Sequence, residues 1–363
     1  MLIGIDASRA ALAQRTGTEN YSLHLIRHLL ALESGHRYRL YFNTPPEPEL
    51  LPSQADVEWR VMPFPRFWTH LRLSREMIRH PPHLLFVPAH VLPIVHPRCS
   101  VVTVHDLGYL YYPQTYRLLD RIYLDLSTRY NARAASRLIA VSSATKRDLV
   151  ERYGVPPGKI TVVHSGRDES LGPVDDRALI EAVKERYGIH GEYILHVGTL
   201  HPRKNLGRLI EAYSLLQETT KLVIAGKRGW LYEGIFRQVE ALGLTGKVLF
   251  PGYVDQSDLP ALLSGASLFV LPSLYEGFGF PVLEAMACGT PVICSFVSSL
   301  PEVTGDAALL IDPRDVESLA EAMRRLLEDE ELRADLVKHG FQQVNRFSWE
   351  KCARETLAVL ESQ

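Results

Sequence analysis

Short apolar runs alternate with amphipathic stretches along the whole chain, which is typical of β-α-β units in parallel sheets. In the first half the apolar runs predict strands at Leu2–Asp6, Tyr38–Phe42, Val57–Val61, Leu84–Val87, Val101–His105, Arg137–Val141 and Ile160–His164. Helical spacing predicts helices at Tyr21–Leu32 and Ser143–Tyr153. A stretch containing glycine and proline, Gly166–Pro173, then interrupts the pattern and suits a linker.

The alternation starts again after this linker. Strands are expected at Tyr193–Val197, Lys221–Ala225, Val248–Pro251, Leu268–Leu271 and Pro291–Cys294. Helices are expected at Leu206–Gln217, Ile235–Leu242, Leu259–Ser264 and Pro281–Cys288, followed by a mostly helical tail over Val316–Gln363. The sequence therefore predicts an α/β protein with two doubly wound domains in tandem. Ligands of such sheets bind beyond the carboxyl ends of the strands, and here also in a cleft between the domains.

The composition is that of an ordinary globular protein. Of 363 residues, 46% are hydrophobic and 23% are charged. No apolar run reaches the roughly 20 residues of a spanning helix, and the start MLIGIDAS lacks the features of a secretory signal. The four cysteines (Cys99, Cys288, Cys294 and Cys352) are scattered and indicate free thiols in a reducing compartment. We therefore expect a cytoplasmic protein.

The net charge of −2 is unevenly distributed. Residues 1–165 hold 20 Lys and Arg against 13 Asp and Glu, whereas residues 166–363 hold 20 against 29. Eighteen of the 20 N-terminal cations are Arg, which suits planar phosphate or carboxylate partners. Two interpretations remain open: the domains have different surfaces, or a basic face meets an anionic substrate or a membrane.

The segment Leu268–Ile293 gives the strongest signal of a binding site. Its strand runs into a glycine turn, and Pro281 stands where a helix begins, a position at which the missing N–H is not needed. Gly277 and Gly279 allow a tight turn and a close approach to a ligand. The free amides and the dipole of a helix start then form an anion site.

Two carboxylates, Glu276 and Glu284, flank this turn eight positions apart. A carboxylate does not bind phosphate, so we expect these side chains to accept hydrogen bonds from sugar and ribose hydroxyls. The alternative is that Glu284 complements the helix dipole in the first turn and that Glu276 is a solvated loop residue.

The segment Tyr193–Tyr213 repeats the order of strand, glycine turn and helix. Here Gly198 follows the strand, and Arg203 and Lys204 stand immediately before the helix. Two adjacent cations beside exposed amides suit a diphosphate whose charge grows as it leaves. Because both loops follow strands of one sheet, together they can clamp one diphosphate. The alternative is an ordinary polar loop.

These segments resemble the retaining glycosyltransferases of family 4, which have two facing Rossmann-like domains (the GT-B fold). The family's E-x7-E element stands here as Glu276 to Glu284 around GFGFP, and its basic pair as Arg203 and Lys204. Its segment of a serine followed by Asp-Leu is similar to Ser143–Leu149, and its GYV segment to Gly252–Val254. The start IGIDAS and the later FSWEKCA are most similar to mannosyltransferase-like members of lipopolysaccharide or exopolysaccharide synthesis.

The resemblance implies a role for each matching residue. Arg203 and Lys204 neutralise the departing diphosphate, Glu276 contacts the sugar hydroxyls and Glu284 the ribose, and the main chain near Tyr253 and Val254 meets the base. The donor-binding residues implied are Gly198, Arg203, Lys204, Tyr253, Val254, Glu276, Gly277, Phe278, Gly279 and Glu284. The last helix is expected to cross back, so that the N-terminal domain holds 1–168 and about 346–363, and the donor domain holds 169–345.

His105 and Asp106 end another buried strand, in the segment Val101–Pro113. The resemblance implies a histidine that reaches the transferred sugar and donates to a hydroxyl rather than acting as a base. By position alone, His105 is equally suited to a structural role, and Asp106 to capping the next turn.

The first loop departs from the family. Relatives carry Gly-x-Gly there, whereas this chain has Arg15-Thr-Gly17-Thr18-Glu19-Asn20. Glu19 would repel phosphate, although Gly17 still permits a close approach and Thr18 still suits a helix cap. We place Gly17, Thr18 and Asp106 in an acceptor or phosphate loop.

The expected function is therefore transfer of a hexose, preferably mannose from GDP-mannose, with retention at the anomeric carbon. The acceptor is a glycan or a polyprenyl-diphosphate-linked sugar, and the reaction uses no metal and no cofactor, since the chain has no Asp-x-Asp pair.

Arginines and aromatics mixed over Phe64–Arg75 suit either a lipid headgroup surface or core packing, so the enzyme is peripheral at the inner membrane face or free in the cytoplasm. Neither nucleic acid nor a G-x-G-x-x-G dehydrogenase site fits. The alternatives are a nucleotide-sugar 2-epimerase of the same fold and a non-catalytic sugar-binding protein.

Overall fold

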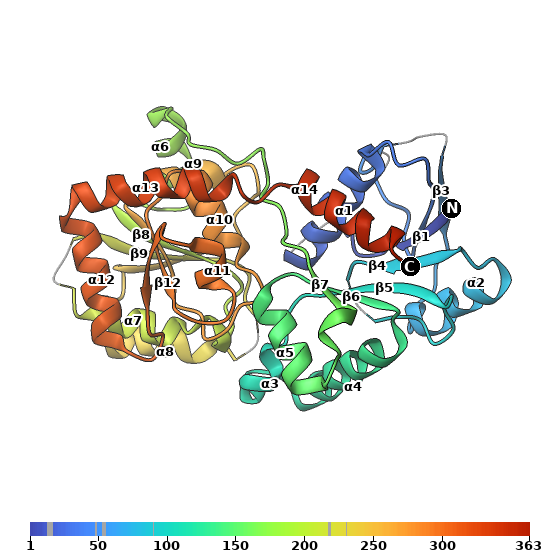
Figure 1. Cartoon of the computed structure of the whole chain (residues 1–363). Coiled ribbons are helices and arrows are strands. Elements are labelled where there is room, and N and C mark those ends of the chain that lie inside the picture. Colours follow the sequence, from blue (N-terminus) through green and yellow to red (C-terminus); the bar gives the residue numbers. More distant parts are fainter. Residues whose placement is uncertain (13–16, 48, 53–55, 90, 217–218, 230) are drawn as a thin grey trace. The chain divides into compact units, whose positions relative to one another are not determined.

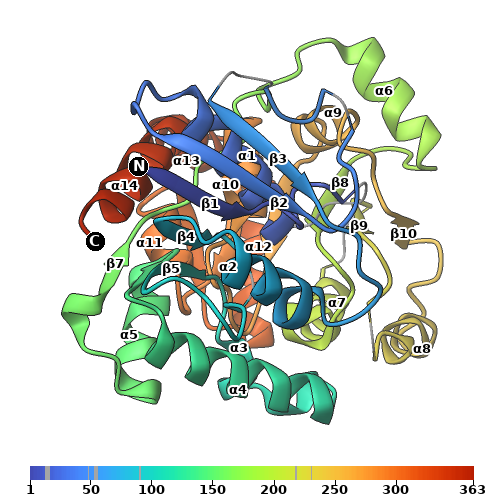
Figure 2. The same cartoon turned by 90° about the vertical axis from the view of Figure 1, so that its right-hand side faces the viewer.

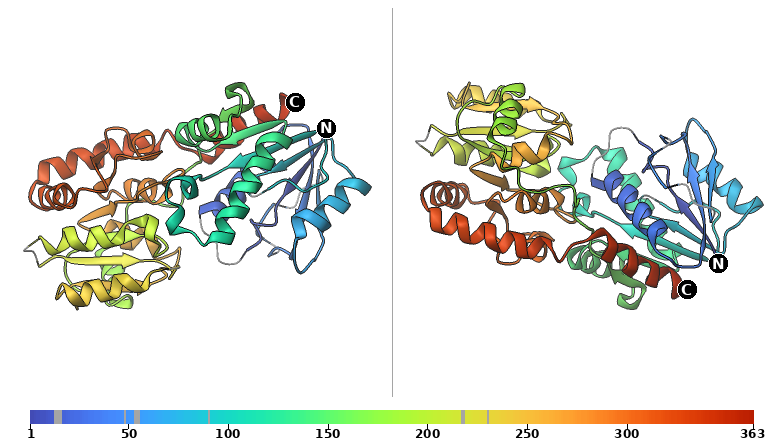
Figure 3. Two further views of the ribbon diagram at one scale, coloured as in Figure 1. Left: turned by 90° about the horizontal axis from the view of Figure 1, so that it is seen from below. Right: turned by 90° about the horizontal axis from the view of Figure 1, so that it is seen from above.

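The computed structural model describes residues 1–363 except 13–16, 48, 53–55, 90, 217–218 and 230. The chain divides into two compact units (Figure 1). The first unit contains Met1–Tyr111, Tyr116–Gly166 and Phe347–Gln363, and the second contains Tyr112–Thr115 and Arg167–Arg346. Each unit is an α/β layer structure in which helices cover both faces of one sheet (Figure 3).

The first unit is built on a seven-stranded parallel sheet in the order β3-β2-β1-β4-β5-β6-β7 (Figure 2). The strands are β1 (Leu2–Asp6), β2 (Arg37–Phe42), β3 (Val57–Val61), β4 (Leu84–Val87), β5 (Cys99–Val104), β6 (Arg137–Ala140) and β7 (Ile160–Val162). Its helices are α1 (Gly17–Ala31), α2 (Ser74–Arg79), α3 (Gly108–Tyr111), α4 (Leu118–Ala134), α5 (Ser143–Tyr153) and α14 (Trp349–Glu361). Short helical turns stand at η1 (Trp68–Leu73) and η3 (Pro157–Lys159), whereas the turn η2 (Pro113–Thr115) belongs to the second unit.

The second unit repeats this plan with a six-stranded parallel sheet in the order β10-β9-β8-β11-β12-β13. Its strands are β8 (Tyr193–Val197), β9 (Lys221–Ala225), β10 (Val248–Gly252), β11 (Leu268–Leu271), β12 (Val292–Ser295) and β13 (Ala308–Ile311). Its helices are α6 (Arg177–Arg186), α7 (Leu206–Ser214), α8 (Glu233–Ala241), α9 (Leu259–Ser264), α10 (Phe280–Ala287), α11 (Leu300–Thr304), α12 (Val316–Glu328) and α13 (Glu330–Val344), with the turn η4 at Pro202–Lys204. Helices α7, α8 and α12 pack together, and α9, α11 and α13 pack with α10.

Strand order reverses once in each sheet, between β1 and β4 and between β8 and β11. In doubly wound sheets the crevice at this switch point, beyond the carboxyl ends of the strands, is where ligands bind. In the second unit the segments after β8 and β11 hold the predicted basic pair and the glycine turn. The fold therefore places both predicted signals at the same switch point.

The chain end returns to the first unit, where α14 (red in Figure 1) packs against α1. A glycine allows the linker to pass beside this helix, since a Cβ on Gly166 would lie 2.2 Å from the backbone nitrogen of Trp349. Such a distance is impossible for any side chain, so the crossing depends on Gly166. In the part of the chain that the structure describes, no helix is long and apolar enough to span a membrane.

Candidate active site

The glycine turn after β11 leads into α10, which begins at Phe280 with Pro281 in its first turn. Gly279 precedes the helix with φ 115°, a conformation that L side chains rarely adopt. A Cβ there would also lie 2.8 Å from Cδ2 of Leu300. Backbone geometry and packing therefore both require glycine at the point where the helix amides begin.

The predicted basic pair lies at this turn. Lys204 Nζ stands 2.6 Å from Glu276 Oε1, and Arg203 Nη1 stands 3.3 Å from Glu276 Oε2. Arg203 also donates to the carbonyl oxygen of Tyr275, and its own carbonyl accepts from the backbone N–H of Leu274 at 2.9 Å. The loops after β8 and β11 are thus joined by charge and by main-chain hydrogen bonds.

Glu276 is 7% exposed, so it is not the solvated loop residue that the alternative interpretation described. Burial raises the pKa of its carboxyl, but the charges of Lys204 and Arg203 outweigh burial and bring the pKa to about 2. Glu276 is therefore ionised throughout the physiological range. Without a ligand it neutralises the two cations that are predicted to hold a diphosphate.

Glu284 is the fifth residue of α10 and lies beyond its first turn, so it does not serve as the dipole-complementing residue of the helix start. Burial, followed by the negative charge of Asp168, raises the pKa of Glu284 to about 7. The two carboxylates of the E-x7-E element therefore differ in state: Glu276 is a fixed anion and Glu284 titrates near neutrality. A group that titrates there can either donate to or accept from a hydroxyl.

Two serines that the sequence analysis missed hold the turn. Ser298 Oγ accepts the backbone N–H of Glu276 at 2.9 Å. The hydroxyl of Ser299 lies 2.9 Å from the carbonyl oxygen of Glu276 and 2.7 Å from that of Phe278. Both serines follow β12 and are distant from the turn in sequence, so no local pattern indicates them. They fix the main chain of the turn through side-chain hydrogen bonds.

The basic pair has supports of its own. His201 Nδ1 accepts the backbone N–H of Arg203 at 3.1 Å and so caps η4. Asn205 adopts a left-handed conformation with φ 61°, and its amide donates to the carbonyl oxygens of Pro272 (3.0 Å) and Pro313 (2.6 Å). These contacts anchor the chain immediately before and after the cations.

The remaining predicted donor-site residues follow β8 and β10. A Cβ on Gly198 would lie 3.4 Å from Cε of Lys204, so glycine leaves room for the lysine side chain. Tyr253 is 45% exposed, and Lys227 Nζ lies 4.7 Å from the centre of its ring. Val254 is buried. Tyr253 thus offers an exposed aromatic surface, while Val254 packs in the core.

In the first unit His105 follows β5, and one of its ring nitrogens already makes a hydrogen bond within the protein. Its Nε2 lies 2.7 Å from the carbonyl oxygen of Pro88, which requires Nε2 to donate, and the ring packs edge-on against Tyr21. Burial lowers the pKa of His105, so the ring is neutral at pH 7. In this state Nδ1 is an acceptor. In this structure the ring proton is engaged by Pro88, and the predicted donation to a sugar hydroxyl stays a prediction.

Asp106 caps the next turn: its Oδ1 accepts the backbone N–H of Gly108 at the start of α3. In the first loop, Arg15 and Thr16 lie outside the described residues, and Gly17 and Thr18 are the first two residues of α1. Thr18 therefore stands inside the helix and not at its cap. Glu19 lies in the first turn of α1, 3.4 Å from Arg9 Nη1, so a cation offsets its charge.

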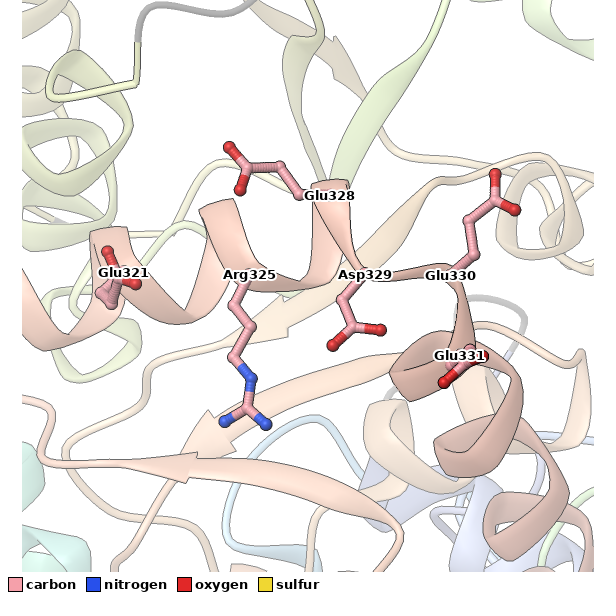
Figure 4. A pocket seen from close by; sticks show the side chains of 6 residues that line it. All are labelled: Glu321, Arg325, Glu328, Asp329, Glu330 and Glu331. Carbon is pink, nitrogen blue, oxygen red and sulfur yellow. The ribbon is translucent and has the colours of Figure 1, made fainter.

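A hollow at the junction of α12 and α13 is lined mostly by carboxylates and not by cations (Figure 4). It is lined by Glu321, Arg325, Glu328, Asp329, Glu330 and Glu331. Five carboxylates against one cation repel a diphosphate, and Asp329 is already used to cap α13. Within the described residues no group of three or more His, Cys, Asp or Glu side chains is arranged to hold a metal ion. A reaction without a metal stays a prediction.

Comparison with known proteins identifies the family. Residues 15–171 match the family model described as Glycosyltransferase Family 4, and residues 181–343 match the one described as Glycosyl transferases group 1. The chain is 35% identical to the O-antigen chain mannosyltransferase B of Escherichia coli over 263 residues, which cover 71% of this chain and 69% of the relative. It is also 35% identical to the E. coli serotype-specific mannosyltransferase WbdA over 226 residues, which cover 60% of this chain and 28% of the relative.

The fold is that of solved GT-B structures. HepE from Anabaena, solved in complex with UDP and glucose, is similar with a TM-score of 0.78 and 19% identity, over 100% of this chain and 99% of HepE. The chain belongs to the family 4 glycosyltransferases. It is an enzyme that transfers a sugar, and it resembles mannosyltransferase members of that family, as the sequence analysis expected.

Proposed function

We propose that this glycosyltransferase moves a mannosyl residue from GDP-mannose to a glycan or polyprenyl-diphosphate-linked acceptor in the synthesis of a cell-surface polysaccharide. The names of the two E. coli relatives support the sugar, because both are mannosyltransferases and one acts on an O-antigen chain. The complex of HepE with UDP and glucose supports a nucleotide-sugar donor, although its nucleotide is not GDP.

The observation that carries the proposal is the contact of Lys204 and Arg203 with Glu276, at the amide end of α10. When the bond between the anomeric carbon and the diphosphate oxygen breaks, negative charge grows on the leaving group. Two fixed cations and the helix amides stabilise that charge, most of all in the transition state. In the ground state the same cations are balanced by Glu276, so the site is organised before the donor arrives.

Glu276 has a second role, in binding the sugar. A carboxylate that is ionised at every working pH accepts hydrogen bonds from sugar hydroxyls and fixes the orientation of the ring. The acceptor oxygen forms the new bond to the anomeric carbon, and its proton passes to the leaving diphosphate. Transfer with retention follows when both events take place on the same face of the sugar.

The test is a comparison of donors without and with acceptor. The enzyme is incubated with GDP-mannose, UDP-glucose, UDP-galactose and ADP-glucose, and the released nucleoside diphosphate is measured by chromatography. The proposal expects slow release of GDP from GDP-mannose, accelerated by a mannosylated acceptor, with an α-linked product by NMR. If another donor is hydrolysed faster, the sugar or the base of that donor replaces the one proposed here. Release of a C2-epimerised free sugar, independent of acceptor, would indicate the epimerase instead.

A further inference from the structure

Helix α4, labelled in Figure 1, is amphipathic in the opposite sense to a normal surface helix, as the burial of its side chains shows. Its buried residues are polar, Thr128 and Asn131. Its large apolar residues point outward, with exposed fractions of 62% for Leu118, 79% for Leu119, 44% for Ile122, 50% for Tyr123 and 59% for Leu126. A soluble domain normally buries the apolar stripe and exposes the polar one. The outward stripe is therefore available to a partner.

Hydrogen bonds fix this orientation. Tyr109 donates to Thr128 Oγ1 at 2.9 Å, and Asn131 Oδ1 accepts the backbone N–H of Leu92 at 3.0 Å. The helix cannot turn its leucines inward without breaking both contacts and leaving buried polar groups unpaired. The apolar positions 118, 119, 122, 123 and 126 recur at helical spacing and form one continuous stripe. The outward stripe is thus built into the fold.

A second exposed apolar segment lies beside this stripe. The hydroxyl of Tyr123 is 3.4 Å from Nε2 of His70, which belongs to η1, and the two rings are in edge-on contact. Next to His70, Phe67 is 70% exposed and Leu71 is 52% exposed. We call the exposed apolar residues of both elements the α4 face: Phe67, Leu71, Leu118, Leu119, Ile122, Tyr123 and Leu126.

The chain segment that carries the α4 face is rich in arginine. Residues 66–133 contain nine arginines, no lysine and four acidic residues. Of those acidic residues, Glu76 is buried between Arg72 and His80, and Asp125 is paired with Arg129 at 2.8 Å. The other two are Asp106, which caps α3, and Asp120 in the first turn of α4, so the arginines of this segment outnumber its acidic residues. Arginine binds phosphate through its planar fork and keeps its stem along apolar surface.

We propose that the α4 face lies on an anionic phospholipid bilayer surface, with its apolar side chains among the upper acyl chains and its arginines against the phosphates. Apolar residues on one face and cations around them are the features of a helix that lies in the membrane interface. A bilayer also accommodates a stripe of this kind without a complementary pocket. The proposal rests on the proposed function only in that a lipid-linked acceptor is presented at that same surface.

The test is cosedimentation of the full chain with vesicles of phosphatidylcholine alone or mixed with phosphatidylglycerol. We expect binding to the anionic vesicles and little to the neutral ones. Raising the salt from 0.1 to 1 M shortens the Debye length from about 10 to about 3 Å and should release most of the protein. Protein that stays in the supernatant with anionic vesicles at low salt overturns the proposal.

Matched variants locate the surface. Leu119→Ser with Leu126→Ser should lower the partition coefficient by about tenfold or more, because two inserted side chains are lost. The control, Leu179→Ser with Leu242→Ser, changes two exposed leucines of the second unit and should bind like the wild type. Equal binding by both pairs overturns the proposal. A wild type that is dimeric by light scattering, with a monomeric Leu119 and Leu126 variant that still binds vesicles, also overturns it, since the α4 face would then contact a second copy.

A third measurement separates this proposal from the proposed function. The Leu119 and Leu126 variant should keep its thermal stabilisation by GDP, because the donor residues lie in the second unit. If vesicle binding fails while GDP still stabilises, only the membrane proposal fails. If GDP fails to stabilise while vesicles bind, only the donor assignment fails.

Discussion

Replacing Glu276 by glutamine removes the charge that Lys204 and Arg203 both contact and keeps the shape of the side chain. The cations are only 12% and 16% exposed, so their mutual repulsion is poorly screened once the anion is gone. We expect the unliganded protein to lose stability. Turnover should fall, while nucleoside diphosphate binding should persist, since the cations that hold it remain.

The magnitude follows from the pKa of Glu276. Its pKa falls from the ordinary 4.5 to about 2, and one unit corresponds to 1.36 kcal/mol, so the ionised state stabilises the fold by about 3 kcal/mol. Because the folded pKa is the lower one, this stability is present above pH 4.5 and is lost as the pH falls toward 2. The effect at pH 7 is therefore close to its maximum.

The assay is urea denaturation of the wild type and of Glu276→Gln at pH 7 and again near pH 2.5. The gap in the free energy of unfolding should be about 3 kcal/mol at pH 7 and should shrink markedly at the lower pH. The control Glu321→Gln removes an exposed partner of Arg324 and should cost about 0.5 kcal/mol or less. A gap that is absent at pH 7, or equal at both pH values, refutes the ion-pair argument.

Two further substitutions test the other parts of the site. Glu284→Gln should raise the melting temperature at pH 8 and leave it nearly unchanged at pH 4. Burial and Asp168 raise the pKa of this carboxyl from 4.5 to about 7, so the fold loses stability as the pH rises from 4.5 to about 7, and the full loss is present at pH 8. Equal effects at both pH values contradict this reasoning. Gly279→Ala should cost about 1–3 kcal/mol in unfolding experiments, since it combines φ 115° with a contact 2.8 Å from Leu300. The control Gly234→Ala meets nothing within 4 Å and lies in α8, so it should be neutral or slightly stabilising, and an equal loss in both variants would show that the turn is not special.

The sheets were predictable because buried parallel strands are apolar runs with clear ends. Strands β1, β3, β4, β8, β9 and β11 agree with the sequence prediction at both ends. The tail over Val316–Gln363 is helical as expected, in three pieces. Strand β13 was missed, since Ala308–Ile311 is a short run at the sheet edge and only partly buried. Local periodicity does not distinguish such a run from a loop.

Helix α4 was missed because its pattern contradicts the rule used to find helices. Its apolar residues face outward, and the polar Thr128 and Asn131 face inward, so the sequence alone does not reveal which side is buried. The residues of the candidate site came from the sequence, but their electrostatics did not. Spacing indicated Arg203, Lys204 and Glu276 separately. Their contact joins two loops that are distant in sequence, since Lys204 and Glu276 are 72 positions apart. Only the sheet order brings those loops together.

The central claim is that Arg203 and Lys204 hold the donor diphosphate, and calorimetric titration with GDP tests it most directly. The wild type should bind, and Arg203→Ala with Lys204→Ala should weaken binding by about 100-fold or more, because two charge-assisted hydrogen bonds are lost. The control, Arg237→Ala with Lys247→Ala, removes two exposed cations of the same unit and should leave the affinity unchanged. Undiminished binding by the first double variant, with its fold verified by circular dichroism, would contradict the account, as would a wild type that binds none of GDP, UDP and ADP.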